Sequence, residues 1–214
     1  MIPDVLSLGR RFNAAAGTTV YALGKPAKSL FYLSSGRFAS RVASAKGREF
    51  IVTEVPPGQF TPISALLEGS KYVVDGVALS ECEMIAFDSV SLRKLLLRNA
   101  EVADFFLQVA LQRLERRTEQ LTDVALLDAQ ERVAKRLLDI AHKQSARLHD
   151  GMTIRLRDPN HFIGLTIAGV SRETVSRQLR RLANKGMIRR SRRDITLLDI
   201  KQLRSLFEID AAHD

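Results

Sequence analysis

The sequence contains a single cysteine, Cys82, and no uninterrupted apolar run near 18 residues. One thiol excludes an internal disulfide and cannot supply the several thiolates that hold an iron–sulfur cluster. The lack of a long apolar run argues against a membrane-spanning helix, and the first residues do not form a charged-then-apolar secretory signal. We therefore expect a cytoplasmic protein without a membrane partner, and we interpret Cys82 as an ordinary small residue near a strand rather than as a redox sensor.

Histidine is absent from the first 128 residues, since the four histidines are His142, His149, His161 and His213. The N-terminal half therefore has no imidazole for haem or metal, and no Cys/His spacing resembles a zinc site. We interpret the four as surface or capping residues. No nucleophile–base pair or phosphate-binding loop stands outside the C-terminal half. The sequence predicts no cofactor, no metal and no enzyme, and a nucleotide-sensing scaffold or enzyme stays as the alternative from another class.

Positive charge is concentrated in the C-terminal part of the chain. Residues 1–128 contain 15 Lys and Arg against 14 Asp and Glu, whereas residues 129–214 contain 18 against 10. This excess indicates that the C-terminal half binds a polyanion. The whole chain of 214 residues, 45% of them hydrophobic, is long enough for one large or two small domains with a real core.

An amphipathic basic helix is predicted over roughly 172–184. Val175, Leu179 and Leu182 recur at i, i+4 and i+7, which places them on one stripe. The helix has a suitable N-cap in Ser171 and a suitable left-handed C-cap in Gly186. A different stripe contains the polar residues Arg172, Glu173, Ser176, Arg177 and Arg180. One face can therefore pack on the protein core while the other binds a partner. We prefer this interpretation to that of a surface helix whose charges are merely solvated.

The neighbouring segments complete a winged helix-turn-helix. Upstream, residues 162–168 form a short apolar helix followed by a glycine turn at Gly169, so the basic helix is the second of the pair. Downstream, residues 187–198 read as strand, basic turn and strand, which is a wing. The fork of arginine suits guanine and the carboxylate of glutamate suits cytosine, so Arg172, Glu173 and Arg177 are predicted to read G·C pairs, with Ser176 beside them on the same stripe. The residues predicted to contact DNA phosphates are Ser171, Arg180, Lys185, Arg189, Arg190, Arg192 and Arg193.

The stretch GVSRETVSRQLRRLANKGMIRR resembles the DNA-binding signature of the bacterial cyclic-AMP receptor protein and fumarate-nitrate regulator family. The match extends over roughly residues 165–198 and departs from the family pattern at Gly164 and Leu165. The resemblance implies that Arg172, Glu173 and Arg177 contact bases. It also implies a dimeric transcription regulator, which would meet RNA polymerase if it is an activator.

The N-terminal half is predicted to be a β sandwich or jelly roll. Short apolar stretches alternate with turn signals rich in Gly, Pro and Ser from Gly17 to Asp88. The predicted strands are 19–22, 30–33, 38–42, 50–55, 73–79 and 84–87. The segment GTTVYALGKPAKSLFYLSSGRF resembles the cyclic-nucleotide-binding fold, and PPGQF followed by a short helix from Ile63 to Glu68 resembles the approach to its phosphate cassette.

The residues that would bind cyclic AMP in that fold are replaced in this sequence. In relatives that bind it, a glutamate takes the ribose and an Arg-Ser pair takes the phosphate. Alignment on PPGQF places Ile63, with Ser64 beside it, at the glutamate and Val73-Val74 at the Arg-Ser pair. We therefore expect no ordinary cyclic-AMP binding, and instead a different, less charged effector or no small-molecule effector.

A long helix is predicted from Ser89 to about Leu127. Its apolar positions are spaced as in a two-stranded coiled coil, and the alternative is a helix packed on its own domain. The resemblance favours the dimer, and it places Thr118 where a hydroxyl can reach a ligand bound across the interface. The predicted seam consists of Leu107, Leu111, Leu114, Thr118 and Leu121.

Asp128 and Glu131 have the spacing of a capping box, which starts a new helix at 129–144 and marks a hinge. We expect an α+β protein with a β-roll sensor domain at 1–88, a dimerisation helix at 89–127 and a winged helix-turn-helix domain at 128–214. The predicted function is a homodimer that binds double-stranded DNA at a palindromic operator, gated by an effector other than cyclic AMP. A constitutive DNA-binding regulator stays as the alternative.

Overall fold

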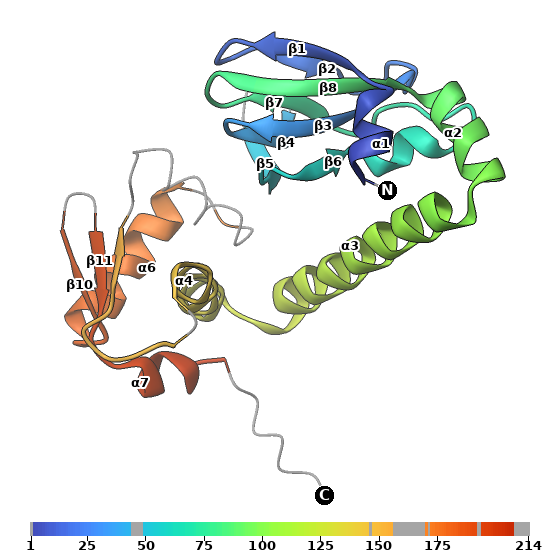
Figure 1. Cartoon of the computed structure of the whole chain (residues 1–214). Coiled ribbons are helices and arrows are strands. Elements are labelled where there is room, and N and C mark those ends of the chain that lie inside the picture. Colours follow the sequence, from blue (N-terminus) through green and yellow to red (C-terminus); the bar gives the residue numbers. More distant parts are fainter. Residues whose placement is uncertain are drawn as a thin grey trace, which may run out of the picture. The chain divides into compact units, whose positions relative to one another are not determined.

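The computed structural model describes residues 2–43, 49–145, 147–155, 170, 172–191 and 194–207. The chain divides into two compact units, Met1–Arg116 and Arg117–Asp214. The first unit is built mainly of strands, and the second combines helices with a small sheet (Figure 1). The predicted α+β class is confirmed: a β-roll is followed by helices and by a C-terminal domain of helices and strands.

Two antiparallel four-stranded sheets form the roll of the first unit. One sheet has the order β1-β8-β3-β6 and the other β2-β7-β4-β5. The strands are β1 Arg10–Ala14, β2 Thr19–Tyr21, β3 Ser29–Ser35, β4 Phe38–Ala43, β5 Glu49–Val55, β6 Gln59–Thr61, β7 Asp75–Ala78 and β8 Cys82–Asp88. All six predicted strands are present with shifted ends, whereas β1, β6 and the helix α1 Ile2–Ser7 were not predicted.

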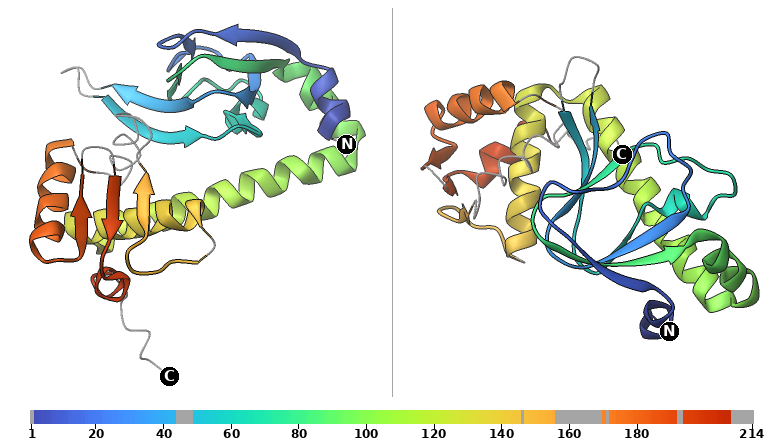
Figure 2. Two further views of the ribbon diagram at one scale, coloured as in Figure 1. Left: turned by 60° about the vertical axis from the view of Figure 1, so that its left-hand side comes forward. Right: turned by 90° about the horizontal axis from the view of Figure 1, so that it is seen from above.

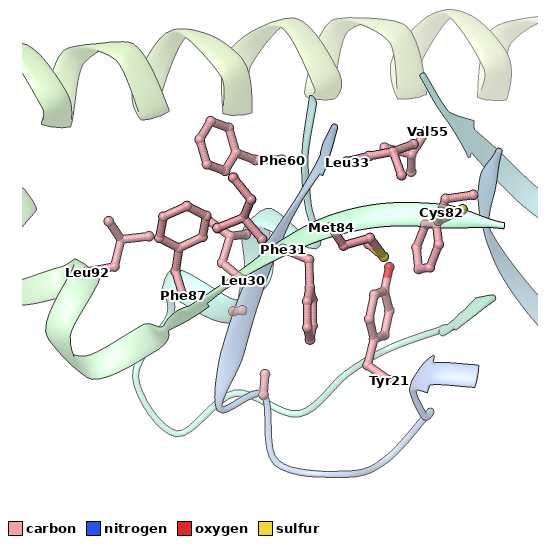
Figure 3. Packing of buried hydrophobic residues seen from close by; sticks show 14 of the residues in the cluster. Tyr21, Leu30, Phe31, Leu33, Val55, Phe60, Cys82, Met84, Phe87 and Leu92 are labelled. Atoms are coloured by element: carbon pink, nitrogen blue, oxygen red, sulfur yellow. The ribbon is translucent and has the colours of Figure 1, made fainter. Parts of the chain in front are cut away.

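The two sheets share one apolar core. Leu30 and Leu33 of β3 are fully buried, and Phe38 of the other sheet is 1% exposed. Figure 3 shows this packing around Phe31, Met84 and other labelled residues. The buried side chains come mainly from the strands, so the short apolar stretches of the sequence supply the core.

The predicted single helix from Ser89 to Leu127 is wrong in one respect, because the structure has two helices there. These are α2 Ser89–Arg98 and α3 Ala100–Leu126, separated by Asn99 in an extended conformation. The Asn99 side-chain oxygen accepts a hydrogen bond from the backbone N–H of Val102, at 3.1 Å. An asparagine that satisfies a free N–H of a first turn is a good helix start, so it ends one helix and begins the next.

Two shorter predictions also need correction. The helix expected from Ile63 to Glu68 is only the 3₁₀ turn η1 Ile63–Leu66. The strand expected at 73–79 is β7, which begins at Asp75, so Val73 and Val74 precede it. Cys82, expected near a strand, is the first residue of β8.

In the described part of the second unit, helices α4, α6 and α7 pack with a three-stranded sheet of order β10-β11-β9 (Figure 2). Its elements are α4 Ala129–Gln144, β9 Thr153–Arg155, α6 Arg172–Asn184, β10 Ile188–Arg190, β11 Asp194–Leu197 and α7 Ile200–Arg204. Leu137 of α4 and Leu179 of α6 are fully buried in its core. The core is separate from that of the roll.

Two predicted helix-end signals in this unit, at Asp128 and at Gly186, are confirmed. The Asp128 carboxylate accepts hydrogen bonds from the backbone N–H groups of Gln130 and Glu131, and the Glu131 carboxylate accepts one from the Asp128 N–H. This reciprocal pairing is the predicted capping box. Gly186, just after α6, has φ +74°, the left-handed conformation that glycine adopts without steric cost.

Candidate nucleic-acid interface and sensor site

Helix α6 has a buried apolar face and an exposed polar face. Val175, Leu179 and Leu182 are each 0% exposed. Glu173, Arg177 and other polar residues of the helix are exposed, and Ser176 is half-buried between the two faces. The predicted apolar stripe is therefore confirmed, and of the predicted polar stripe Glu173, Arg177 and Arg180 are exposed.

One contact on the exposed face orients a predicted base-reading side chain. The Nη2 atom of Arg177 donates to the Thr174 hydroxyl across 3.4 Å, one turn earlier on the helix. This is at the long limit for a hydrogen bond, so the contact restrains the exposed guanidinium only weakly. Arg180 and Lys185 are exposed on the same helix and just after it.

Several predicted DNA contacts lie outside the described residues. They are Ser171, Arg192 and Arg193, together with the first helix of the predicted pair at 162–168. Arg172 is the first residue of α6, but its side chain is also outside the description.

The predicted wing is an antiparallel hairpin. Strand β10 pairs with β11 in the register Ile188↔Leu197 and Arg190↔Ile195. The hairpin end is closed by a backbone bond from Ser191 N–H to the carbonyl of Asp194, at 2.9 Å. Arg189 and Arg190 are both exposed, and β10 is an edge strand. The arrangement brings arginines of the wing and of α6 into one folded unit.

The predicted seam on α3 is exposed. Its four leucines have 50–71% of their surface accessible: Leu107, Leu111, Leu114 and Leu121. Thr118, also exposed, lies on this helix, and its carbonyl accepts a hydrogen bond from the hydroxyl of Thr122. Large apolar side chains that are aligned on one helix face and exposed to solvent are typical of a protein–protein interface.

The residues expected to replace the cyclic-AMP ligands are not brought together into a polar site. Ile63 and Val74 pack against the apolar core of the roll. Val73 is 66% exposed, and the Ser64 carbonyl accepts from the Ser70 hydroxyl at 2.8 Å. The replacements therefore act as ordinary core and loop residues.

Two tyrosines that the sequence interpretation missed lie in the roll interior instead. Tyr21 and Tyr72 have ring centroids 4.8 Å apart, and Tyr21 also stacks on Phe31 at 5.6 Å. The Tyr21 hydroxyl bonds to the hydroxyls of Ser40 and Thr61, at 3.3 and 3.1 Å. Burial raises the pKa of Tyr21, so its hydroxyl stays neutral and can donate.

A strand glycine is the signal that could have located this cluster. At Gly76 an added Cβ would lie 2.2 Å from Cε1 of Tyr21 and 2.7 Å from Cζ of Phe38. Glycine inside a strand often marks a close approach of another group. Here the approaching group is the Tyr21 ring, so the missing side chain of Gly76 makes room for the cluster.

A charged residue of α3 reaches the same region from outside the sheet. Arg113 donates through Nη2 to the carbonyl of Phe60, the residue before Thr61 on β6. The Phe60 ring also packs against Phe105 and Phe106 of α3, with centroids 6.0 and 4.9 Å apart. Strand β6 is therefore contacted by Tyr21 from within the roll and by α3 on its other side.

Cys82 is fully buried, and its thiol donates to the Arg37 carbonyl at 3.1 Å. Burial raises the pKa of this thiol, which lowers its thiolate fraction and its reactivity. His142 and His149 are exposed. In the described ranges, no three His, Cys, Asp or Glu side chains gather as for a metal ion, and no helix there is long and apolar enough to cross a membrane.

Comparison with known proteins assigns both units. The chain matches the Cyclic nucleotide-binding domain over residues 11–99 and the Crp-like helix-turn-helix domain over residues 131–206. A β-roll of the first type joined to a DNA-binding domain of the second defines a transcription regulator. The chain belongs to the cyclic-AMP receptor protein and fumarate-nitrate regulator family.

Relatives from several bacteria share this organisation. The cAMP-activated global transcriptional regulator CRP of Haemophilus influenzae is 31% identical over 175 residues, covering 81% of this chain and 77% of the relative. The cAMP-activated global transcriptional regulator Vfr of Pseudomonas aeruginosa is 32% identical over 184 residues, covering 84% of each.

Solved structures share the fold at lower identity. The c-di-GMP responsive global regulator CLP of Xanthomonas campestris aligns with a TM-score of 0.75 and 24% identity, covering 92% of this chain and 97% of that one. A CooA mutant from Carboxydothermus hydrogenoformans aligns with a TM-score of 0.78 and 18% identity, covering 94% and 89%.

Proposed function

We propose that this regulator is a homodimer that binds a palindromic operator and responds to an effector other than cyclic AMP, or to none. Its proposed parts are a roll at 1–88, dimer helices at 89–127 and a DNA-binding domain at 128–214. The single observation that carries the DNA-binding proposal is the two-faced helix α6, with three fully buried apolar anchors and exposed arginines beside an arginine-bearing hairpin. Since the proposed ligand is chromosomal DNA, the cytoplasm is its proposed place of action.

The proposed reading of DNA divides the basic residues by role. Arg172, Glu173, Ser176 and Arg177 on α6 enter the major groove, where an arginine fork recognises guanine O6 and N7. The residues proposed to contact phosphates are Ser171, Arg180, Lys185, Arg189, Arg190, Arg192 and Arg193. Base contacts select the sequence, whereas phosphate contacts fix the orientation of the protein on the duplex.

The proposed dimer explains the exposed leucines of α3. A second copy of the helix would cover Leu107, Leu111, Leu114 and Leu121, each at least half exposed in one chain. Two copies present two α6 helices, which can reach successive major grooves about 34 Å apart. If the protein activates transcription, RNA polymerase is a further partner.

Leu114→Glu and the matched exposed change Glu115→Gln test the dimer. Sedimentation equilibrium should show a monomer for the first variant and a dimer for the second. A dimer that survives Leu114→Glu with full operator affinity argues against this interface.

The proposed lack of cyclic-AMP control rests on the chemistry of the roll. The positions aligned with its ligands hold Ile63, Val73 and Val74, which cannot pair with an anionic phosphate. A ligand bound by the native state alone, at about 100 times its dissociation constant, adds roughly 2.7 kcal/mol to stability. Millimolar cyclic AMP should therefore leave both the thermal midpoint and operator affinity unchanged, and a shift in either would refute this part.

Constitutive binding is the second candidate, and the aromatic cluster favours it. Tyr21 and Tyr72 occupy the roll interior together with Phe31 and Phe38. A regulator of this kind would be controlled by its abundance alone. Thr118 stays the proposed contact for an effector bound across the dimer if one exists.

Selection of bound DNA from a random pool tests the function and its control together. The expected result is an inverted repeat with G·C pairs inside each half-site. The selection should be repeated with small metabolites extracted from cells, since an increase in recovery would indicate an effector. Recovery of asymmetric or purely A·T-rich sequences would contradict the proposed reading.

A further inference from the structure

Helix α3 has two different faces along its N-terminal half. Val102 and Phe106, 4% and 3% exposed, recur at i and i+4 and pack into the roll core. Arg113 follows seven residues after Phe106 on the same face, since seven residues are close to two helical turns. The leucine seam lies on a separate face of this helix, where its side chains are open. Helix α3 thus contains both the residues that attach it to the roll and the leucines of the exposed seam, so a rotation of the helix moves both.

Arg113 is placed to extend this attachment. A seven-residue step corresponds to about 10 Å along the helix axis, so its bond to the Phe60 carbonyl lies well beyond the Phe106 contact. A hydrogen bond from a guanidinium to a neutral acceptor is stronger than one between neutral groups. Arg113 is also half-buried, which reduces competition from water for the carbonyl.

The acceptor strand is itself held firmly. Phe60 and Thr61 are each 2% exposed, and β6 pairs with β3 through Tyr32↔Phe60 and Phe31↔Thr61. The Tyr21 hydroxyl bonds to Thr61 on the interior side. Arg113 therefore contacts a fixed point of the sheet and not a loose loop.

We propose that Arg113 is a positioning residue: its bond to the Phe60 carbonyl fixes the rotation of α3 on the roll and so orients the leucine seam without an effector. The functional half of this inference rests on the proposed dimeric operator binding. The roll and the helix are connected within one chain. The Tyr21 hydroxyl bonds to Thr61, and the carbonyl of the preceding residue, Phe60, accepts from Arg113.

The test uses three full-length variants. Arg113→Met keeps most of the stem and removes the donors, whereas Arg113→Lys keeps the charge and one donating group. Arg116→Met is the matched control, because Arg116 is an exposed arginine three residues further along the same helix. Hydrogen exchange of α3 amides from 107 to 116, in the absence of DNA, reports the anchor directly. Operator affinity without added ligand reports its consequence.

For Arg113→Met we expect at least tenfold faster exchange in this part of α3, unchanged exchange in β3 and β8, and about tenfold weaker operator binding. Arg113→Lys should lie between this variant and the wild type, and Arg116→Met should match the wild type. Unchanged α3 exchange in Arg113→Met overturns the anchor. Uniformly faster exchange across the roll also overturns it, because the residue would then act on general stability.

Two further outcomes separate the parts of the inference. Faster α3 exchange with full operator affinity would overturn the orienting role while leaving the DNA-binding proposal intact. Local loss of protection in Arg113→Met, together with a wild type that binds no operator, would support the anchor and refute the proposed function.

Discussion

The basic residues of α6 and the wing and the hydroxyl cluster of the roll lie in opposite environments. In the second unit, Arg177 and Arg189 face solvent, while the leucines of α6 are buried. In the roll, the Tyr21 hydroxyl and its partners Ser40 and Thr61 are all buried and bond to one another. Outward charges can meet a polyanion without any rearrangement of the core, whereas inward hydroxyls satisfy each other and specify how the two sheets pack.

This difference predicts which substitutions change stability and which change binding. Buried groups are expected to act on the free energy of unfolding of their own unit, because removing or crowding them disturbs close packing. Exposed arginines are expected to leave stability nearly unchanged and to act on DNA affinity.

The largest expected effect is the loss of an anchor beneath the exposed face of α6. Leu179→Ala removes a fully buried side chain and should lower the free energy of unfolding of the second unit by about 2–5 kcal/mol. Denaturant unfolding, monitored in each unit by hydrogen exchange, measures the change in the free energy of unfolding. The free energy of unfolding of the roll should not change. The control Arg180→Ala should stay within about 0.5 kcal/mol. Equal losses for both variants would contradict the assigned faces.

The corresponding change in the roll adds a methyl group. Gly76→Ala places a Cβ against the rings of Tyr21 and Phe38, and overpacking of this kind costs about 1–3 kcal/mol. Exchange should accelerate in β2 and β7 but not in α6. Thr19→Ala, at an exposed position on β2, is the control and should be nearly neutral. An unchanged free energy of unfolding in Gly76→Ala would show that the rings of Tyr21 and Phe38 can move aside without loss of stability.

The described elements of the second unit were predicted better from the sequence than the interior of the roll. The interacting residues are close in sequence in the first case and far apart in the second. The faces of α6, the Asp128 capping box and the Gly186 helix end depend on neighbours within one or two turns. The Tyr21–Thr61 contact joins residues 40 positions apart, and only the pairing of strands brings them together. No periodicity within a short window contains that information.

One of the wrong predictions has a local physical cause. Asn99 interrupts an otherwise helical stretch, since its side chain caps α3, yet the apolar spacing continues through it. The alignment on PPGQF concerned only Ile63, Val73 and Val74. It could not show that tyrosine rings from β2 and from the segment before β7 fill the interior.

A smaller and sequence-dependent effect is expected on the exposed face of α6. Arg177→Ala removes a possible bidentate contact with guanine, which should cost about 1–3 kcal/mol on the selected operator and relax the preference at one base pair. Titrations with the operator, a one-base variant of it and unrelated DNA measure both quantities. Protein stability should not change. An equal loss on all three DNAs would assign Arg177 to phosphate contact instead.

The smallest effect is expected from the wing, where Arg189→Ala removes one exposed cation from β10. Each phosphate contact contributes about 0.9 to the slope of log affinity against log salt, because the protein releases condensed counterions on binding. The variant should therefore bind operator and unrelated DNA more weakly by the same factor, and its salt slope should be shallower by about one unit. Titrations at four or more salt concentrations measure the slope, with Arg177→Ala as the matched arginine in the same unit. A change in base preference with Arg189→Ala would reverse the assigned roles of helix and wing. An unchanged slope would mean that Arg189 stays in solvent in the complex, and the wing would then contribute through its other arginines.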